Sequence, residues 1–150
     1  MDTIIKLDIP QGYEYYGIEF DSGKILLRKK PIEFPKDYDS CCKMLNIINS
    51  GIPCIMASHL GHNISNFAKL IVARDAYWKV YAENIGLDRP WKPDWTNTNE
   101  QKYNIYCVAG ELKMQPSCEL QHVLAFPTRE MCIAFYNNFK TLIESCKDLI

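Results

Sequence analysis

Apolar residues recur at helical spacing through residues 65–84, the longest such pattern in the chain. The positions on the apolar side are Phe67, Leu70, Ile71, Tyr77, Trp78, Tyr81 and Ile85. Steps of three, four and seven residues gather side chains on one side of an α-helix, so this segment is predicted to be a helix that faces the core. Asn63 or Ser65 is the expected N-cap, and Gly86 is the expected C-terminal stop.

Arg74 interrupts this apolar face, because it places a charged side chain at a position on the same side of the helix as the large apolar residues. A buried charge must be paired, so the residue needs a partner. We expect its aliphatic stem to pack on Trp78 or Leu70 while the guanidinium reaches solvent or an acidic group. The alternative is an arginine that binds a ligand.

Hydrophobic and polar residues alternate in the first thirty positions, as they do in half-buried strands. Residues 3–9 and 16–20 show the alternation, and residues 25–29 are the expected returning strand. Pro10 to Gly12 and Asp21 to Gly23 supply turn chemistry between these segments. We therefore predict a three-stranded antiparallel meander. The basic residues 28–30 would protect its edge from pairing with another chain, or would contact phosphate.

The pattern in the rest of the sequence predicts helices and a later pair of strands. Residues 38–48 have helical spacing, with Asp37 or Asp39 as the cap, and Thr128 is the expected N-cap of a terminal helix. Residues 103–109 and 121–126 are rich in strand formers, and residues 110–117 are expected to form an exposed loop between them. Residues 49–62 stay ambiguous. The prediction is one α+β domain, residues 1–150, with an antiparallel sheet packed against two or three helices.

Two tryptophans lie in a segment that prolines keep extended. The sequence PWKPDW follows Arg89 and places Trp91 and Trp95 four residues apart around Lys92. Each proline removes an amide donor and disfavours helix in the residue before it. The tryptophans either seal the end of the core or form a platform on which a base or sugar stacks, helped by Arg89, Lys92 and Lys79.

Charge and cysteine content narrow the function classes. The chain has 17 basic and 18 acidic residues, and this balance lacks the positive surface that non-specific nucleic-acid binding needs. Seven cysteines, with no apolar signal segment and no run long enough to span a membrane, predict free thiols in a reducing compartment. We expect a cytoplasmic or virion location and no membrane partner.

Candidate chemistry is sparse. Cys54, His59 and His62 are weak candidates for a metal site, but a structural zinc site normally has tight ligand pairs, so we expect no metal. Cys118 with His122, or Cys54 with His59, would need tertiary geometry to act as a nucleophile pair. The phosphate-loop, dinucleotide, hydrolase-elbow and zincin motifs are absent from the sequence. We therefore predict no catalytic residues and no cofactor.

Six segments form a distinctive series along the chain: IPQGYE, PKDYDSCCKML, KLIVARDAYWK, PWKPDW, LAFPTREM and FYNNFKTLIESCKDLI. These segments resemble a family of small uncharacterised proteins from gut Bacteroidales and their phages or prophages. They span nearly the whole chain in a distinctive order. The resemblance implies a phage-linked protein, in the host cytoplasm or in the virion, and it carries over no site residues.

The leading functional hypothesis is a non-enzymatic protein–protein interaction or structural module, with phage structural proteins or a second copy of the chain as partner. The alternative is a nucleic-acid or nucleotide binder that uses Trp91 and Trp95 with the nearby Lys79, Arg89 and Lys92. The candidate binding residues are Arg74, Arg89, Trp91, Lys92 and Trp95. A thiol- or metal-dependent enzyme is the third hypothesis.

Overall fold

The computed structural model describes residues 7–48, 59–118 and 121–150. Its elements are β1 (Tyr13–Glu19), β2 (Lys24–Lys29), α1 (Tyr38–Leu45), α2 (His59–Asn84), β3 (Lys102–Val108), β4 (Glu111–Ser117), β5 (Leu124–Phe126), α3 (Arg129–Ser145) and a 3-10 turn, η2 (Lys147–Leu149). Strands β1 and β2 form a two-stranded sheet, and β4, β3 and β5, in that order, form a three-stranded sheet. All pairings are antiparallel, which confirms the predicted α+β class.

The predicted N-terminal meander is observed only as a hairpin. Residues 7–9 adopt no strand, and residues 3–6 of the first predicted strand lie outside the described residues. The turn predicted at Pro10 to Gly12 is present, because the amide of Tyr13 donates to the carbonyl of Pro10. The turn predicted between the two strands is also present, with Gly23 at φ 64°.

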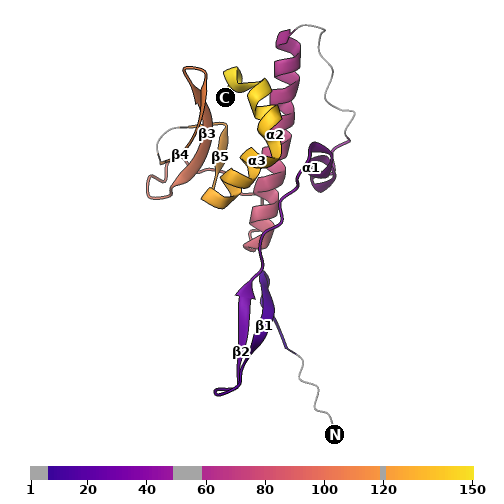
Figure 1. Ribbon diagram of the computed structural model, residues 1–150, viewed down its shortest axis with the longest axis vertical. Coiled ribbons are helices and arrows are strands. Elements are labelled where there is room, and N and C mark those ends of the chain that lie inside the picture. Colours follow the sequence, from indigo (N-terminus) through magenta and orange to yellow (C-terminus); the bar gives the residue numbers. More distant parts are fainter. Residues whose placement is uncertain (1–6, 49–58, 119–120) are drawn as a thin grey trace.

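The body of the molecule is built around α2. Helices α1 and α3 pack against α2, and α3 also packs against β3 and β5 (Figure 1). Tyr77 is fully buried at the centre, stacked on Phe34 at 4.6 Å and edge-on to Phe135 at 5.0 Å. The hydroxyl of Tyr77 donates to the backbone carbonyl of Pro35 and accepts a hydrogen bond from the side-chain amide of Asn138. The helical face that contains Tyr77 is therefore the core face, as predicted, but Ile85, the last residue of the predicted row, follows α2 and is 41 % exposed.

Helix α2 begins earlier than the sequence suggested. Asn63 and Ser65, the predicted N-caps, lie inside the helix, which begins at His59. Both residue types also occur within helices, so their capping preference marks a start only where the preceding residues cannot continue the helix. The predicted end is correct: Gly86 has φ 75°, and the amide of Leu87 donates to the carbonyl of Ala82, as in a glycine-terminated helix.

The predicted caps of the other helices are confirmed. The side chain of Asp37 accepts from the amide of Ser40 at the start of α1, which selects Asp37 over Asp39. The side chain of Thr128 accepts from the amide of Met131 at the start of α3. A kink at Phe139, where the backbone leaves helical geometry, lets α3 turn its second half along the core.

The prediction of a loop at residues 110–117 is wrong, because residues 111–117 form the strand β4. Ala109 and Gly110 have φ of 53° and 80°, the left-handed pair that closes a tight two-residue hairpin. The pairing of β4 with β3 is continuous from Val108 and Glu111 to Lys102 and Ser117. Lysine, glutamine and proline hid this edge strand, since they are poor strand formers that an edge tolerates.

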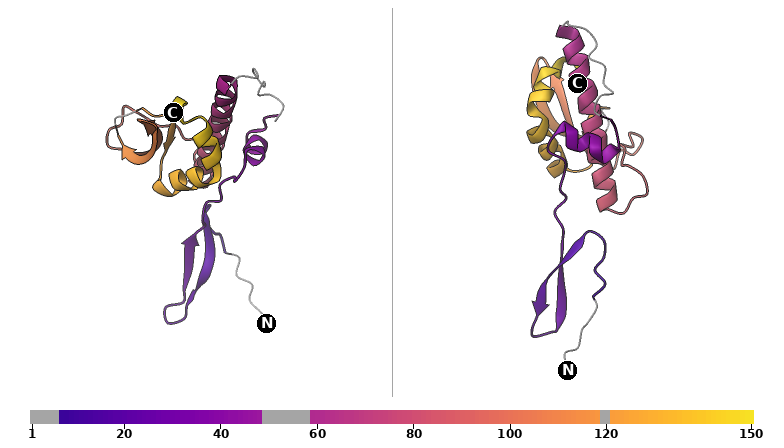
Figure 2. Two further views of the ribbon diagram at one scale, coloured as in Figure 1. Left: turned by 45° about the horizontal axis from the view of Figure 1, so that its top comes forward. Right: turned by 90° about the vertical axis from the view of Figure 1, so that its right-hand side faces the viewer.

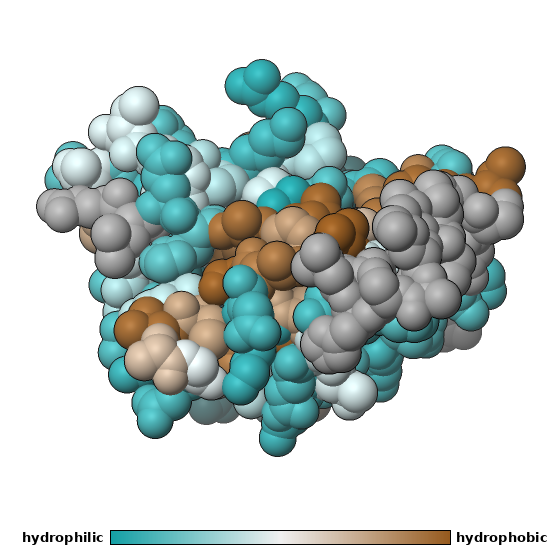
Figure 3. All heavy atoms as spheres, turned by 90° about the horizontal axis from the view of Figure 1, so that it is seen from above, coloured by the Kyte–Doolittle hydropathy of each residue, from teal (hydrophilic) through white to brown (hydrophobic). Residues whose placement is uncertain are grey.

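The β1–β2 hairpin projects beyond the helical body in every view (Figures 1 and 2). The opposite end of the molecule shows a band of hydrophobic residues between hydrophilic ones (Figure 3). None of the helices in the described part of the chain is long and apolar enough to cross a membrane.

Candidate functional site

The first candidate site is the loop that contains the two tryptophans. Trp91 is only 8 % exposed and lies edge-on to Trp78, with ring centroids 5.6 Å apart. Its amide donates to the carbonyl of Trp78 at 3.3 Å. Arg89 and Lys92 are exposed beside it, along an open hollow of about 1030 Å³ that the loop itself lines. This burial favours the packing interpretation of Trp91.

Trp95 lies in a different environment. Its ring is half-buried, and the ammonium of Lys102 lies 5.8 Å from the ring centroid. Lys102 is fully buried and donates to the carbonyl of Asn97 at 2.8 Å, with Glu100 at 3.6 Å. The structure therefore gives the two tryptophans separate neighbours, and each ring already has a contact within the chain.

Arg74 has partners that explain its position on the apolar face. Its guanidinium lies over the ring of Trp78 at 4.1 Å, and it donates to the carboxylate of Asp75 at 2.7 Å and to the carbonyl of Val123 at 2.9 Å. Its side chain is 15 % exposed. The expected packing on Trp78 and the expected acidic partner are both present, and these contacts hold the start of β5 against α2.

Two buried polar residues were missed by the sequence reasoning. Lys102 and Asn104 are fully buried on β3, where strict alternation with Tyr103 and Ile105 predicts an exposed polar face. The side-chain nitrogen of Asn104 donates to the carbonyl of Lys102, but the side-chain oxygen of Asn104 has no partner among the described residues. No signal in the sequence marks this face as covered.

The described cysteines are free thiols: Cys41, Cys42, Cys107, Cys118, Cys132 and Cys146. Burial raises the pKa of Cys41 and that of Cys132 to about 12, and the pKa of Cys146 to about 11. A thiol with such a pKa stays protonated at neutral pH, and the thiolate is the nucleophile. These buried cysteines behave as small apolar residues of the core.

The histidine candidates are not brought into a cluster in the described part of the chain. His122 stacks on Tyr106 with centroids 4.3 Å apart, its Nε2 is buried with no hydrogen-bond partner among the described residues, and burial lowers its pKa. His62 is exposed. Cys54 and the side chain of His59 lie outside the described residues, and the described residues hold no group of three potential metal ligands.

The β1–β2 hairpin is the second candidate site, and its pairing register defines two faces. Tyr15 lies opposite Leu27, Gly17 opposite Leu26 and Ile18 opposite Ile25. The register shifts between Tyr15 and Gly17, which is a β-bulge. Opposite residues share a face and successive residues alternate, so the bulge puts Tyr15 and Ile18 on the same face although they are three residues apart.

We call this surface the apolar face of the hairpin. Its apolar members are Tyr13, Tyr15, Ile18, Ile25 and Leu27, which are between 37 % and 51 % exposed, and Lys29, opposite Tyr13, lies at its base. The other face is mostly polar: Arg28 pairs with Glu14 and covers the ring of Tyr16 at 5.1 Å, and Leu26, opposite Gly17, is its one aliphatic side chain among the paired residues. Among the described residues, none from the hairpin belongs to the hydrophobic core of the body. The hairpin is therefore an amphipathic two-stranded sheet with an open apolar side.

The base of the hairpin is fastened to the end of α2. The side-chain amide of Gln11 donates to the carbonyl of Glu83 at 3.0 Å. Gly12, with φ 83°, lies so close to Asn84 that an added Cβ would meet the backbone oxygen of Asn84 at 3.1 Å. The amide of Lys30 closes the base by donating to the carbonyl of Gly12. The sequence predicted the strands but carried no signal for this attachment.

Comparison of the chain with protein-family models, with curated protein sequences and with solved structures finds no match.

Proposed function

We propose that this protein is a non-enzymatic protein–protein interaction module that attaches to a protein partner through the apolar face of the β1–β2 hairpin. The observation that carries the proposal is an amphipathic hairpin that projects from the body with its apolar side uncovered. A sheet normally buries its apolar face against another layer, and a lone two-stranded hairpin is only marginally stable in water. A partner would supply the missing layer.

The character of the surface supports a protein rather than a nucleic acid as partner. Contiguous apolar patches on a projecting element are typical of protein interaction sites. Nucleic-acid binding is driven by cations on phosphate, whereas the apolar face offers aromatic and aliphatic side chains and the whole chain has a formal net charge of −1. Trp91, which the nucleic-acid alternative would use, and Arg74, the other candidate binding residue, are engaged within the chain.

The resemblance to proteins of gut Bacteroidales and their phages supplies the setting of this proposal. In that setting the partner is a component of a phage particle, or a protein of the host cytoplasm on which the module acts as an accessory. The protein needs no catalytic group for either role.

The size of the native assembly tests the proposal. Ile18→Lys places a charge in the middle of the apolar face, and Lys24→Ala, on the polar face, is the matched control. Each tagged variant is produced in the native host, its assembly is sized by sedimentation, and the partner identified by mass spectrometry is then rebound in purified form. We expect the wild type and Lys24→Ala to be in an assembly larger than the 17.4 kDa chain and Ile18→Lys to be released from it.

Two results would contradict the proposal. One is a wild-type chain that sediments alone in its host, and the other is an Ile18→Lys variant that stays in the assembly while circular dichroism shows an unchanged fold. The nucleic-acid alternative is tested in parallel with single-stranded oligonucleotide: strong quenching of tryptophan fluorescence by acrylamide that the oligonucleotide suppresses would favour it.

A further inference from the structure

We propose that the partner of the hairpin is a second copy of this chain, whose pocket between the β3–β4 pair and α3 receives Phe20 from the hairpin tip. The inference rests on the proposed function and names the partner and the receiving site.

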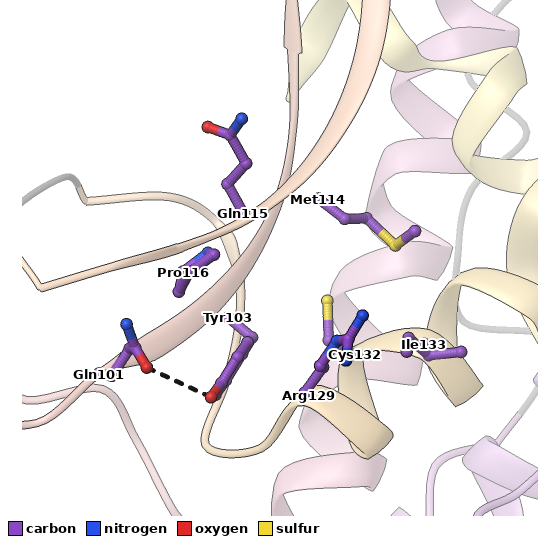
Figure 4. A pocket seen from close by; sticks show the side chains of 8 residues that line it. All are labelled: Gln101, Tyr103, Met114, Gln115, Pro116, Arg129, Cys132 and Ile133. Carbon is purple, nitrogen blue, oxygen red and sulfur yellow. Dashed lines mark hydrogen bonds between the residues drawn. The ribbon is translucent and has the colours of Figure 1, made fainter.

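The pocket has a volume of about 380 Å³ and opens beside the first turns of α3. Figure 4 shows that the lining side chains come from both strands, from Gln101 just before β3 and from the first turns of α3. Its lining is mainly apolar and includes Tyr103, Met114, Pro116, Cys132 and Ile133, with Arg129 at the rim. Tyr103 lies opposite Pro116, and Met114 lies opposite the buried Ile105, so the strands turn one shared face toward α3.

The hairpin tip carries a large apolar side chain between acids. Phe20 directly follows β1 and is 95 % exposed. Glu19 precedes it and accepts a hydrogen bond from the hydroxyl of Ser22, and Asp21 follows it. Gly23, whose amide donates to the carbonyl of Glu19, closes the turn. The tip is thus a hydrogen-bonded turn that presents one aromatic ring, with an acidic residue directly before and after it in the sequence.

Size and charge match the tip to the pocket. A cavity of roughly 150 Å³ is enough to hold benzene, so a pocket of about 380 Å³ has room for the ring of Phe20 and part of the turn. Arg129 makes no hydrogen bond or ion pair within the described residues, and an arginine at an interface rim suits a carboxylate. Asp21 and Glu19 would supply that carboxylate as the ring enters.

The contact must form between copies. The hairpin points away from the body that contains the pocket in all views (Figures 1 and 2), so the tip of one chain lies far from its own pocket. Tip and pocket are different surfaces of the molecule, and a contact of this kind is head-to-tail. Such contacts build rings or open filaments rather than closed symmetric dimers.

Sedimentation equilibrium of the purified chain over a range of concentrations is the first test. The wild type is expected to associate beyond a dimer. Phe20→Ala should raise the dissociation constant by about 30-fold or more, the effect of losing an aromatic anchor at an interface centre. Ile48→Ala is the matched control, because Ile48 is also strongly exposed (78 %) but belongs to neither surface, and it should associate like the wild type.

A mixing experiment tests the head-to-tail geometry. Ile133→Lys blocks the pocket and leaves the tip intact, whereas Phe20→Ala removes the tip and leaves the pocket intact. Each variant alone should be monomeric, and an equimolar mixture should stop at a dimer, because one good tip and one good pocket remain. The charge contact is tested by Arg129→Asp, which should weaken association, and by its combination with Asp21→Arg, which should restore it.

The inference is overturned if the wild type stays monomeric at its highest soluble concentration, or if Phe20→Ala and Ile133→Lys associate like the wild type. Neither result decides the proposed function, which the native assembly tests independently. If Ile18→Lys is released from the native assembly while Phe20→Ala stays in it, the apolar face binds a different protein and only this inference fails.

Discussion

Trp78→Ala is the sharpest test of how the body is held together. Trp78, on α2, is only 6 % exposed. It contacts both the proline-rich loop and β5. Its ring contacts Trp91 of the proline-rich loop and lies under the guanidinium of Arg74. Its Nε1 donates to the carbonyl of Ala125 on β5 at 2.8 Å. Removing the indole therefore loosens α2, the loop and β5 together.

The expected loss follows from these contacts. Truncating a large buried aromatic residue to alanine costs about 3–5 kcal/mol, because the transfer free energy is lost and a cavity remains. The broken hydrogen bond leaves the carbonyl of Ala125 without its donor, and the ring pair and the cation contact are lost as well. These contributions overlap with the truncation, so we expect the upper part of that range, about 4–5 kcal/mol.

Urea denaturation followed by far-ultraviolet circular dichroism measures this loss as a change in the free energy of unfolding. Trp78→Phe is the matched control, since it keeps an aromatic ring and removes the Nε1 donor, and it should cost about 1–2 kcal/mol. Trp91→Ala completes a double-mutant cycle, with a coupling of about 0.5–1.5 kcal/mol expected for rings in contact. A loss below about 1 kcal/mol for Trp78→Ala would refute this account of the core.

The remaining predictions concern titrating groups. Because burial raises the pKa of Cys132 to about 12, alkylation of the folded protein, read by mass spectrometry, should modify the half-buried Cys118 far faster than Cys132; equal rates would contradict the packing of α3. Burial lowers the pKa of His122 below 6.5, so the unfolded chain binds a proton first, and stability should fall as the pH drops from about 6.5 through the folded pKa. His122→Phe should remove this part of the pH dependence between pH 7.5 and 5.5, and an unchanged dependence would show that His122 stays solvated.

Periodic patterns and turn residues predicted most of the secondary structure. The face of α2 that contains Tyr77, the caps at Asp37 and Thr128, and the stop at Gly86 are local features, and the structure confirms them. Strand β4 was missed because it is an edge strand whose polar residues look like a loop. The start of α2 was misplaced because a capping residue within a helix looks the same in the sequence as one at its end.

The candidate sites depended on tertiary neighbours that no local pattern encodes. Besides the adjacent Asp75, the guanidinium of Arg74 has a tertiary partner in the carbonyl of Val123. The buried ammonium of Lys102 donates to the carbonyl of Asn97 and lies 5.8 Å from the ring centroid of Trp95, both in the segment that precedes β3. Alternation over residues 16–20 predicts Tyr16 and Ile18 on one face, which is wrong, because the bulge puts Ile18 with Tyr15 and leaves Tyr16 beside Arg28 on the other face. The sequence also does not indicate whether the apolar face packs inside the chain or on a partner.

The hairpin combines a fixed base with an open face, and this combination favours attachment over aggregation. Gln11 and Gly12 fix the base on the end of α2, so the proposed partner would meet a hairpin whose position on the body is already set, and binding costs fall when a surface is already arranged. The ion pair between Glu14 and Arg28, together with Lys24 at the far end of β2, places charge on the polar face, a device that discourages strand edges from pairing at random. The bulge near Tyr15 increases the twist of the hairpin, and a twisted edge pairs less readily with the strand of another chain. An apolar surface that is held in position and flanked by charge in this way is suited to one complementary partner rather than to indiscriminate contact.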